Sequence, residues 1–186
     1  IKVAMLDSGI DPDHPYIKKM WTQERDGGSY RDFVGVDPTP CDRDGHGTHC
    51  AGIILQHAPE VSLYIGRVVD TQKSCLKDRS LHHKAKALEW ALQEVKADIV
   101  SMSFGLPWEA PGISNLILKN LVSTTFVAAA ANSGSSEPVA FPASESTVLC
   151  MHACGGNGKP SLFTPPVQSY NNNFMVLGER VPSCWP

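Results

Sequence analysis

Short, almost wholly apolar runs recur along this chain, and segments with helical periodicity separate several of them. The runs are residues 1–6, 61–69, 98–104, 125–131 and 147–153. Their length and composition are typical of strands that are buried on both faces of a parallel sheet. Parallel neighbours need crossover connections, which helices usually supply. The predicted fold class is therefore α/β, a three-layer sandwich with a mostly parallel central sheet.

The segments between the runs complete this prediction. Apolar side chains recur at helical spacing in residues 79–96 and again between Ile113 and Leu121, and residues 50–57 form a third helical segment that Pro59 ends. The Asp-, Pro- and Gly-rich stretch before Gly45 is predicted to be a loop. The last 30 residues hold at most one strand, near residues 174–177.

Length and charge limit the organisation and the partners. With 186 residues, one hydrophobic core is the default, so residues 1–186 are predicted to be a single domain. The net charge of −3 gives no reason to expect a nucleic acid as partner. The basic cluster His82-His83-Lys84 with Lys86 is interpreted as a solvated helix face. No apolar run has the length of a membrane span, so no membrane partner is expected.

Several polar residues stand where predicted strands end. Asp7 follows the first run, Ser103 and Gly105 follow the third, and Asn132 follows a run of alanines. In parallel sheets, ligands bind at the carboxyl ends of the strands, so these residues are expected to gather at one edge. His46 is at the start of a predicted helix, and this helix end can lie at the same edge of the sheet.

Each of these signals also has a purely structural explanation. Asp7-Ser8-Gly9 is a common turn, Asn132 can be a cap, and His46 can be a satisfied histidine at a helix end. His46 and His49 could bind a metal, although no further ligand has suitable spacing. Alternatively, helix-dipole repulsion keeps His46 a neutral base, and the Asn132 amide faces a developing oxyanion.

Taken together and in order, the motifs resemble the subtilase family. The matching segments are Val-Ala-Met-Leu-Asp-Ser-Gly-Ile-Asp at 3–11 with His14-Pro15, Asp-Gly-His-Gly-Thr-His-Cys-Ala-Gly at 44–52, Ser-Met-Ser-Phe-Gly at 101–105, and Ala-Ala-Ala-Asn-Ser-Gly at 129–134 with Phe-Pro-Ala at 141–143. The resemblance reaches from Ile1 to about Ala153. It implies a subtilisin-like fold and hydrolysis of peptide bonds by a serine endopeptidase with an Asp-His-Ser triad.

The resemblance also implies roles for single residues. Asp7 would orient His46 and stabilise its imidazolium, and His46 would act as the general base. Asn132 would donate a hydrogen bond to the oxyanion. The segment Ser101, Ser103, Phe104 and Gly105 would bind an extended peptide or protein substrate as an additional strand.

The nucleophile is the main departure from the family pattern. No Gly-Thr-Ser-x-Ala motif occurs in residues 1–186, and Ser161, Ser169 and Ser183 lack its small neighbours. We expect the domain to be partial at both ends, with the serine shortly beyond Pro186 and a pro-segment or further domains elsewhere in the whole protein. This chain alone is then expected to be inactive.

The alternative is a catalytically dead subtilase-fold binding module. A nucleotide-binding domain is excluded because no G-x-G-x-x-G follows the first strand.

Calcium and the cysteines give further expectations. Hydrolysis needs no cofactor, and the usual calcium site of the family is predicted absent, because residues 52–59 carry no insertion and Tyr16 replaces an aspartate. Other calcium sites stay open.

Cys150, His152 and Cys154 are predicted to lie on the same face of a strand. We interpret them as core residues, and a metal site is the alternative. Cys50, Cys75, Cys150 and Cys154 fall largely within predicted elements, as reduced thiols do. The localisation stays open, with an intracellular compartment favoured over secretion.

Overall fold

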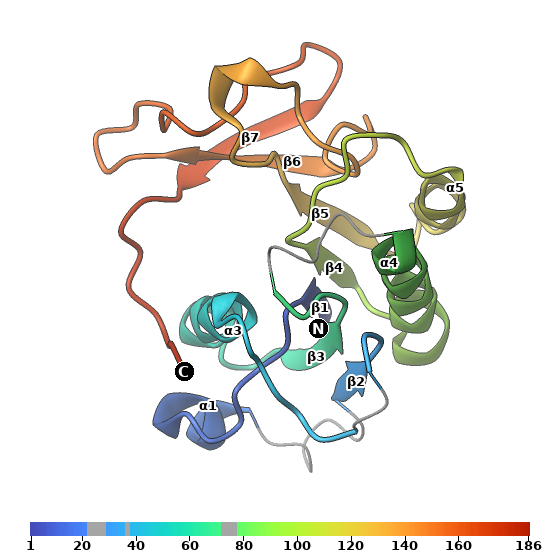
Figure 1. The fold of residues 1–186 in the computed structure, drawn as a ribbon, viewed down its shortest axis with the longest axis vertical. Helices are drawn as coiled ribbons and strands as arrows, with labels where there is room; N and C mark the ends of the chain where they lie inside the picture. The colour runs from blue at the N-terminus through green and yellow to red at the C-terminus, as the bar shows by residue number, and fades with distance from the viewer. Residues whose placement is uncertain (22–28, 36–37, 72–77) are drawn as a thin grey trace. The chain divides into compact units, whose positions relative to one another are not determined.

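The apolar runs form the strands of an α/β fold. In the computed structural model, which describes residues 1–21, 29–35, 38–71 and 78–186, seven strands belong to one parallel sheet. The chain divides into two compact units, residues 1–101 with 183–186, and residues 102–182. The predicted fold class is confirmed. Figure 1 labels the elements.

The first unit contains the N-terminal strands and most of the helices. Its elements are β1 (Lys2–Asp7), α1 (Pro15–Met20), β2 (Tyr30–Asp32), α3 (His46–His57), β3 (Ser62–Arg67), α4 (Asp78–Trp90), the π-helical turn η2 (Ala91–Val95) and β4 (Ile99–Met102), whose last residue falls in the second unit. The strand order is β2-β3-β1-β4. β1 and β3 pair in parallel, with Asp7 opposite Arg67.

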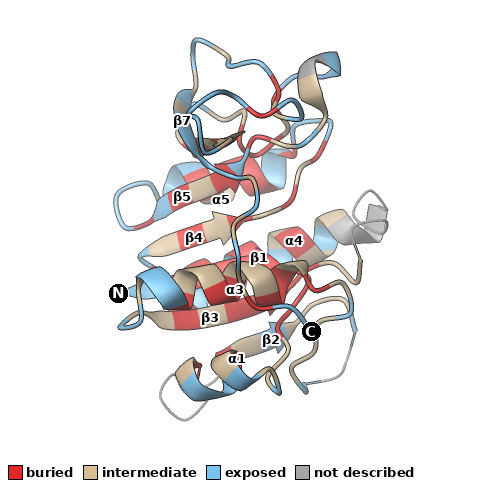
Figure 2. Ribbon diagram, turned by 90° about the vertical axis from the view of Figure 1, so that its left-hand side faces the viewer, coloured by how far each residue is buried: buried red, intermediate tan, exposed pale blue. Residues whose placement is uncertain are grey.

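Helices cover both faces of this part of the sheet. On one face, Met5 and Ile65 pack with Ile17 of α1 and Leu55 of α3 in a buried cluster. On the other face, Gly66 leaves room for the ring of Trp90, which ends α4. Figure 2 shows that α3 and α4 each carry both buried and exposed residues. This is the predicted three-layer arrangement.

The second unit has a smaller set of elements. They are α5 (Pro111–Lys119), β5 (Thr125–Ala129), the 3-10 turn η3 (Gly134–Ser136), β6 (Leu149–Cys154) and β7 (Asn172–Leu177), with the strand order β5-β6-β7. β7 is the one strand of the last 30 residues, as predicted. β5 is shorter than predicted, because Ala131 has a φ of 98° and a left-handed residue cannot continue a strand.

Two short elements lie where only a loop was predicted. α1 begins with Pro15 at its first position, and the ring of His14 accepts a hydrogen bond from the backbone N–H of Tyr16 at 3.2 Å. β2 has three residues. Neither element is long enough to give a periodic signal, which explains why the pattern missed them.

The basic cluster on α4 is only partly solvated, so that interpretation was wrong for one residue. His82 and Lys86 are exposed, whereas Lys84 is fully buried. Lys84 precedes Ala87 and Leu88 by three and four positions, and both are buried. The helical period therefore places the lysine on the face that packs against the core. Among the described residues, no helix combines the length and apolarity that crossing a bilayer requires.

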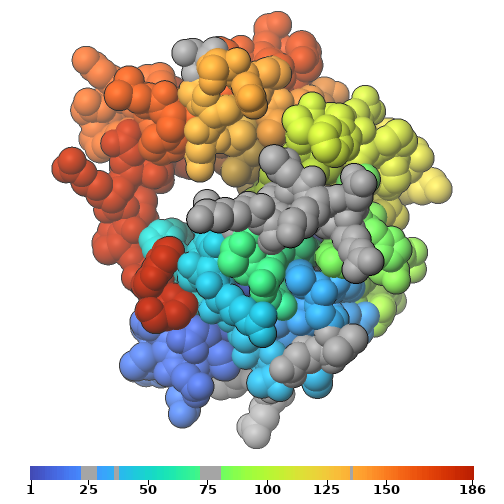
Figure 3. All heavy atoms as spheres, viewed as in Figure 1, coloured from blue at the N-terminus to red at the C-terminus, as the bar shows by residue number. Residues whose placement is uncertain are grey.

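The C-terminal residues pack onto the first unit. Cys184 is buried in the cluster that contains Met5 and Leu55, and the Ser183 hydroxyl donates a hydrogen bond to the backbone carbonyl of His49 at 2.7 Å. The indole of Trp185 lies over Gly45, where a Cβ would come within 2.7 Å of the ring. Figure 3 shows this red segment against the cyan atoms near the start of α3.

A close backbone approach sets α3 against the loop after β1. A Cβ on Gly47 would overlap the carbonyl oxygen of Gly9 and would lie 2.9 Å from its amide nitrogen. Both partners are backbone atoms, which cannot move aside as a flexible side chain can. The first turn of α3 can therefore reach this loop only with glycine at position 47.

We predict that Gly47→Ala lowers the free energy of unfolding by about 1–3 kcal/mol or more, because the added methyl group forces the two backbones apart. Urea unfolding followed by circular dichroism measures this. Gly112→Ala is the control, since nothing lies within 4 Å of its added Cβ, and it should be neutral or stabilising by up to about 1 kcal/mol. Equal stability of the two variants would contradict the close approach.

Candidate functional site

The end of β1 and the start of α3 bring Asp7 and His46 together. Asp7 is the last residue of β1, and His46 is the first residue of α3. Asp7 Oδ1 lies 2.8 Å from His46 Nδ1. The Asp7 side chain is 2% exposed and that of His46 is 36% exposed. The pair thus has a buried acid and a ring that solvent can reach.

Asp7 is held mainly through one of its two oxygens. Oδ1 also accepts a hydrogen bond from the backbone N–H of Ser8 at 2.7 Å. Oδ2 is buried and has no hydrogen-bond partner within the described part of the chain. A buried carboxylate with an unused oxygen is costly, and the costs of such groups are tolerated most often at functional sites.

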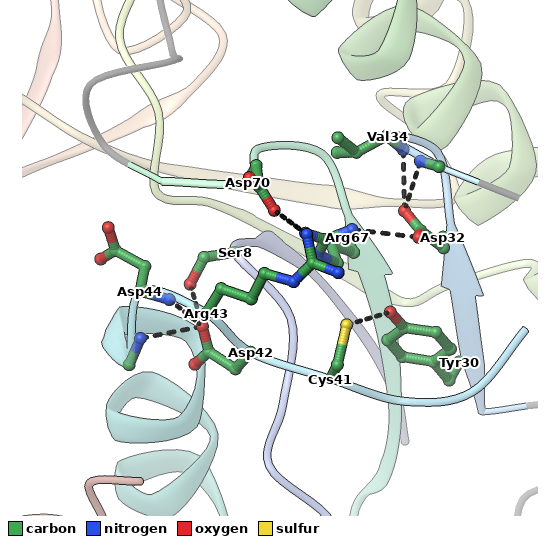
Figure 4. A network of polar contacts seen from close by, with 12 residues as sticks. Ser8, Tyr30, Asp32, Val34, Cys41, Asp42, Arg43, Asp44, Arg67 and Asp70 are labelled. Atoms are coloured by element: carbon green, nitrogen blue, oxygen red, sulfur yellow. Dashed lines mark hydrogen bonds and ion pairs between the residues drawn. The ribbon is translucent and has the colours of Figure 1, made fainter. Parts of the chain in front are cut away.

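Asp42 joins the loop that follows Asp7 to the helix that begins with His46. Its Oδ1 accepts from the Ser8 hydroxyl and the Gly45 N–H, each at 2.9 Å. Its Oδ2 accepts from the N–H and the hydroxyl of Thr48, at 2.8 and 2.7 Å. Figure 4 shows Asp42 between Ser8 and the turn that starts α3. Ser8 in turn accepts from the Gly47 N–H at 2.9 Å.

These bonds also keep Asp42 ionised. Burial alone would raise the pKa of Asp42, but the hydrogen bonds from Thr48 and Gly45 outweigh burial and hold the pKa below its usual value. An acid before a helix that accepts from the first turn is an N-terminal capping arrangement. We missed Asp42 in the sequence, although an aspartate just ahead of a helix start was a usable signal.

A second carboxylate network surrounds Arg67, the residue paired with Asp7 in the sheet. The Arg67 guanidinium is buried and forms ion pairs with Asp32, at 3.0 Å, and with Asp70. Burial would lower the pKa of Arg67, but the neighbouring negative groups, Asp32 first among them, together outweigh burial and raise the pKa. Figure 4 shows both acids converging on the guanidinium. Because Asp32 and Asp70 form the ion pairs with Arg67, the carboxylate of Asp7 is left to interact with His46.

The surroundings of His46 favour its charged form. The hydrogen bond with Asp7 is the largest cause, and the contact with Cys50 acts in the same direction. Burial opposes both but is weaker, so the pKa of His46 lies well above its usual value of 6.5. The hydrogen bond with Asp7 thus favours the imidazolium, the opposite of what the helix dipole alone led us to expect. An imidazolium next to a carboxylate is the charge arrangement that a general base reaches once it has taken a proton.

Cys50 lies one helical turn beyond His46 and beside its ring. Its Sγ is 3.8 Å from Nδ1 and 3.9 Å from Nε2 of His46. Cys50 is a free, half-buried thiol that packs against the core cluster and also reaches the ring of His46. The i, i+4 spacing on a helix was the signal that could have placed it here. His49, considered as a metal partner of His46, instead lies edge-on to Trp185 with ring centroids 6.3 Å apart.

The other predicted site residues follow their strands as expected. Asn132 is exposed and comes directly after Ala131, whose positive φ turns the chain out of β5. Ser103 and Gly105 are half-buried and Phe104 is buried, in the segment after β4; Ser101 lies within β4. Asp7 and His46 belong to the first unit, whereas Asn132 belongs to the second, so the gathering of all of them at one edge stays a prediction.

The alternating residues of β6 form a polar contact network. His152 Nε2 lies 2.9 Å from Asn173 Oδ1 and 3.3 Å from Cys150 Sγ, and its Nδ1 lies 3.4 Å from the Thr164 hydroxyl. Within the described residues, the one group with metal-binding spacing is instead Asp7, His46 and Cys50. Cys41, Cys50, Cys150, Cys154 and Cys184 form no disulfide, and Cys75 lies outside the described residues.

Comparison with known proteins places these features in a family. A model described as the subtilase family matches residues 1–175. The chain is 30% identical to Subtilisin-like protease het-Q2 of Podospora anserina over 97% of this chain and 60% of that protein. It is 32% identical to Subtilisin E of Bacillus subtilis over 88% of this chain and 43% of that protein.

A solved structure agrees with the sequence relatives. The structure of the prenylagaramide maturation protease PagA superposes with a TM-score of 0.78 and 25% identity, and the match covers 100% of this chain and 65% of that one. The chain thus spans less than two thirds of each of these relatives. The subtilase model covers residues 1–175, which include β1 with Asp7 and α3 with His46, and on this basis the chain belongs to the subtilase family.

Proposed function

We propose that the whole protein is a serine endopeptidase, in which this chain supplies the acid, the base and one oxyanion donor. The contact of 2.8 Å between Asp7 Oδ1 and His46 Nδ1 carries the proposal. It fixes the ring so that Nε2 is the nitrogen left for a substrate or a nucleophile. In this arrangement Nε2 takes the proton of a serine hydroxyl and later passes it to the leaving amine, while Asp7 stabilises the imidazolium.

The other roles follow the family pattern. The amide of Asn132 donates to the oxyanion of the tetrahedral intermediate; such a donor contributes about 10²–10³ in kcat. The backbone of residues 101–105 pairs with an extended peptide, so the substrate is a peptide or protein in strand conformation. The exposed position of Asn132 and the half-buried positions of Ser101, Ser103 and Gly105 are compatible with these contacts.

The serine itself is proposed to come from polypeptide that follows Pro186. Trp185 lies over Gly45, the residue before His46, and Ser183 is hydrogen-bonded to His49 of the same helix. A segment joined to this end therefore starts beside the first turn of α3. A nucleophile placed shortly after it has only a short distance to travel to reach His46.

We predict that Asp7→Asn in the whole, processed protein lowers kcat for a peptide substrate by about 10⁴-fold, the size seen for this change in other triad hydrolases. The asparagine cannot stabilise the imidazolium, and it favours the wrong ring tautomer. Steady-state hydrolysis assays measure the loss. The control Asp13→Asn changes an exposed acid outside the site and should retain activity within about twofold. Full activity of Asp7→Asn, or no hydrolysis by the folded wild type, would favour the binding module instead.

The pH dependence provides a separate prediction on the 186-residue chain. Since the pKa of His46 is raised by Asp7, the His46 ring should stay protonated as the pH passes 6.5 and lose its proton only at higher pH. Asp7→Asn should lower the midpoint by more than one pH unit, and Asp13→Asn should leave it unchanged. NMR titration of the ring Cε1–H signal measures both.

The same shift determines how stability and hydrolysis vary with pH. The Asp7–His46 contact stabilises the fold fully below pH 6.5 and loses this contribution as the pH rises through the raised pKa of His46. Hydrolysis, which needs neutral His46, should increase over that same alkaline range. A His46 midpoint at or below 6.5 in the wild-type chain contradicts the assignment of Asp7 as its partner.

A further inference from the structure

We propose that Asp7, His46 and Cys50 form a binding site for a thiophilic divalent cation, with Zn²⁺ as the physiological candidate. Each residue offers one ligand atom, and the three atoms all lie within 4.8 Å of one another. A carboxylate, an imidazole and a thiolate are the ligands that zinc takes in proteins, usually four in number with water in an open position. The thiolate and the imidazole favour zinc over calcium and magnesium, which prefer oxygen.

The sulfur–nitrogen distance is close to that of a zinc site. Tetrahedral zinc with a sulfur ligand at about 2.3 Å and a nitrogen ligand at about 2.0–2.1 Å separates the two ligands by about 3.5 Å. The Cys50 Sγ is 3.8 Å from His46 Nδ1 and 3.9 Å from Nε2. Closing this gap requires a movement of a few tenths of an ångström. Because Sγ is almost equally far from both nitrogens, the ring must also turn so that a lone pair points at the ion.

The unused oxygen of Asp7 independently indicates a ligand. Asp7 Oδ2 is buried, and no described residue donates a hydrogen bond to it. The contact with His46 Nδ1 at 2.8 Å is made by Oδ1, so a cation that replaced the shared proton would give Oδ2 a partner by binding both oxygens of the carboxylate. The half-buried thiol and the partly exposed ring leave a route for the ion.

Binding would change the chemistry of the Asp7–His46 pair. The Cys50 thiol and the ring nitrogen release their protons to the buffer when they bind the ion. The ring then points a lone pair at the metal, so Asp7 and His46 no longer act together as a base. Reversible inhibition of hydrolysis follows, and this consequence rests on the proposed function. Binding itself needs only the three side chains and is measured without substrate.

The test is zinc binding by the reduced, metal-free 186-residue chain in competition with a chromogenic chelator. We expect one ion at this site, and we expect Cys50→Ser and His46→Asn each to weaken binding by at least the roughly 10–100-fold that the loss of an outer partner causes in zinc sites. Cys41→Ser is the matched control, since Cys41 is also half-buried in the first unit and forms no disulfide. It should bind zinc as the wild type does. Circular dichroism checks the fold of each variant.

Cobalt(II) gives a readout that does not depend on comparing affinities. A thiolate ligand produces a sulfur-to-cobalt charge-transfer band in the near ultraviolet, which should appear in the wild type and Cys41→Ser and be missing in Cys50→Ser. The proposal is overturned if the wild-type chain binds no zinc, or if Cys50→Ser keeps the band and the affinity. If the whole protein hydrolyses peptides but binds no zinc, the proposed metal site is refuted and the proposed function stands. If zinc binds but the whole protein does not hydrolyse peptides, the metal site is supported and only its proposed inhibition of hydrolysis is refuted.

Discussion

The carboxylate of Asp42 is the interaction on which the geometry of the site depends. It accepts hydrogen bonds from Ser8, the residue after Asp7, and from Gly45 and Thr48, which flank His46. Hydrogen bonds to a charged acceptor contribute more than neutral ones, about 1.5–3 kcal/mol each. One side chain therefore sets the distance between two segments that are 39 residues apart in the sequence. The close approach of Gly47 to Gly9 is the steric counterpart of this electrostatic link.

The site combines the Asp7–His46 charge pair with the thiol of Cys50, which lies beside the same imidazole ring. Asp7 raises the pKa of His46 and aligns its ring, which suits a base that must stabilise a proton once it has taken one. Cys50 lies against the same ring, and its position lets a soft cation compete with that proton. The proposed catalysis and the proposed inhibition thus share Asp7 and His46, and only the inhibition adds Cys50.

Most of the fold could be predicted because buried parallel strands leave a strong local signal. The runs around Met5, Ile65 and Val100 are short and apolar, and each is a strand of the structure. Asp7 and His46 could be expected to lie close together because their motif has a fixed local context, and their contact of 2.8 Å agrees with this. Asp42 and Cys50 were missed although each had a local signal, a position just ahead of a helix start and an i, i+4 spacing from His46; only the contact of Asp42 with Ser8 depends on the folded chain. The burial of Lys84 was missed because the charge of the residue was weighed more heavily than its helical position.

The most direct test of the central claim is labelling of the longest natural polypeptide that contains this chain with a fluorophosphonate probe, followed by peptide mapping. His46→Ala and the 186-residue chain serve as controls. The account predicts labelling of a serine that lies beyond residue 186, with loss of labelling in His46→Ala and no labelling of the 186-residue chain. A folded, fully processed wild-type protein that is not labelled, or a His46→Ala variant that is labelled as fast as the wild type, would contradict it.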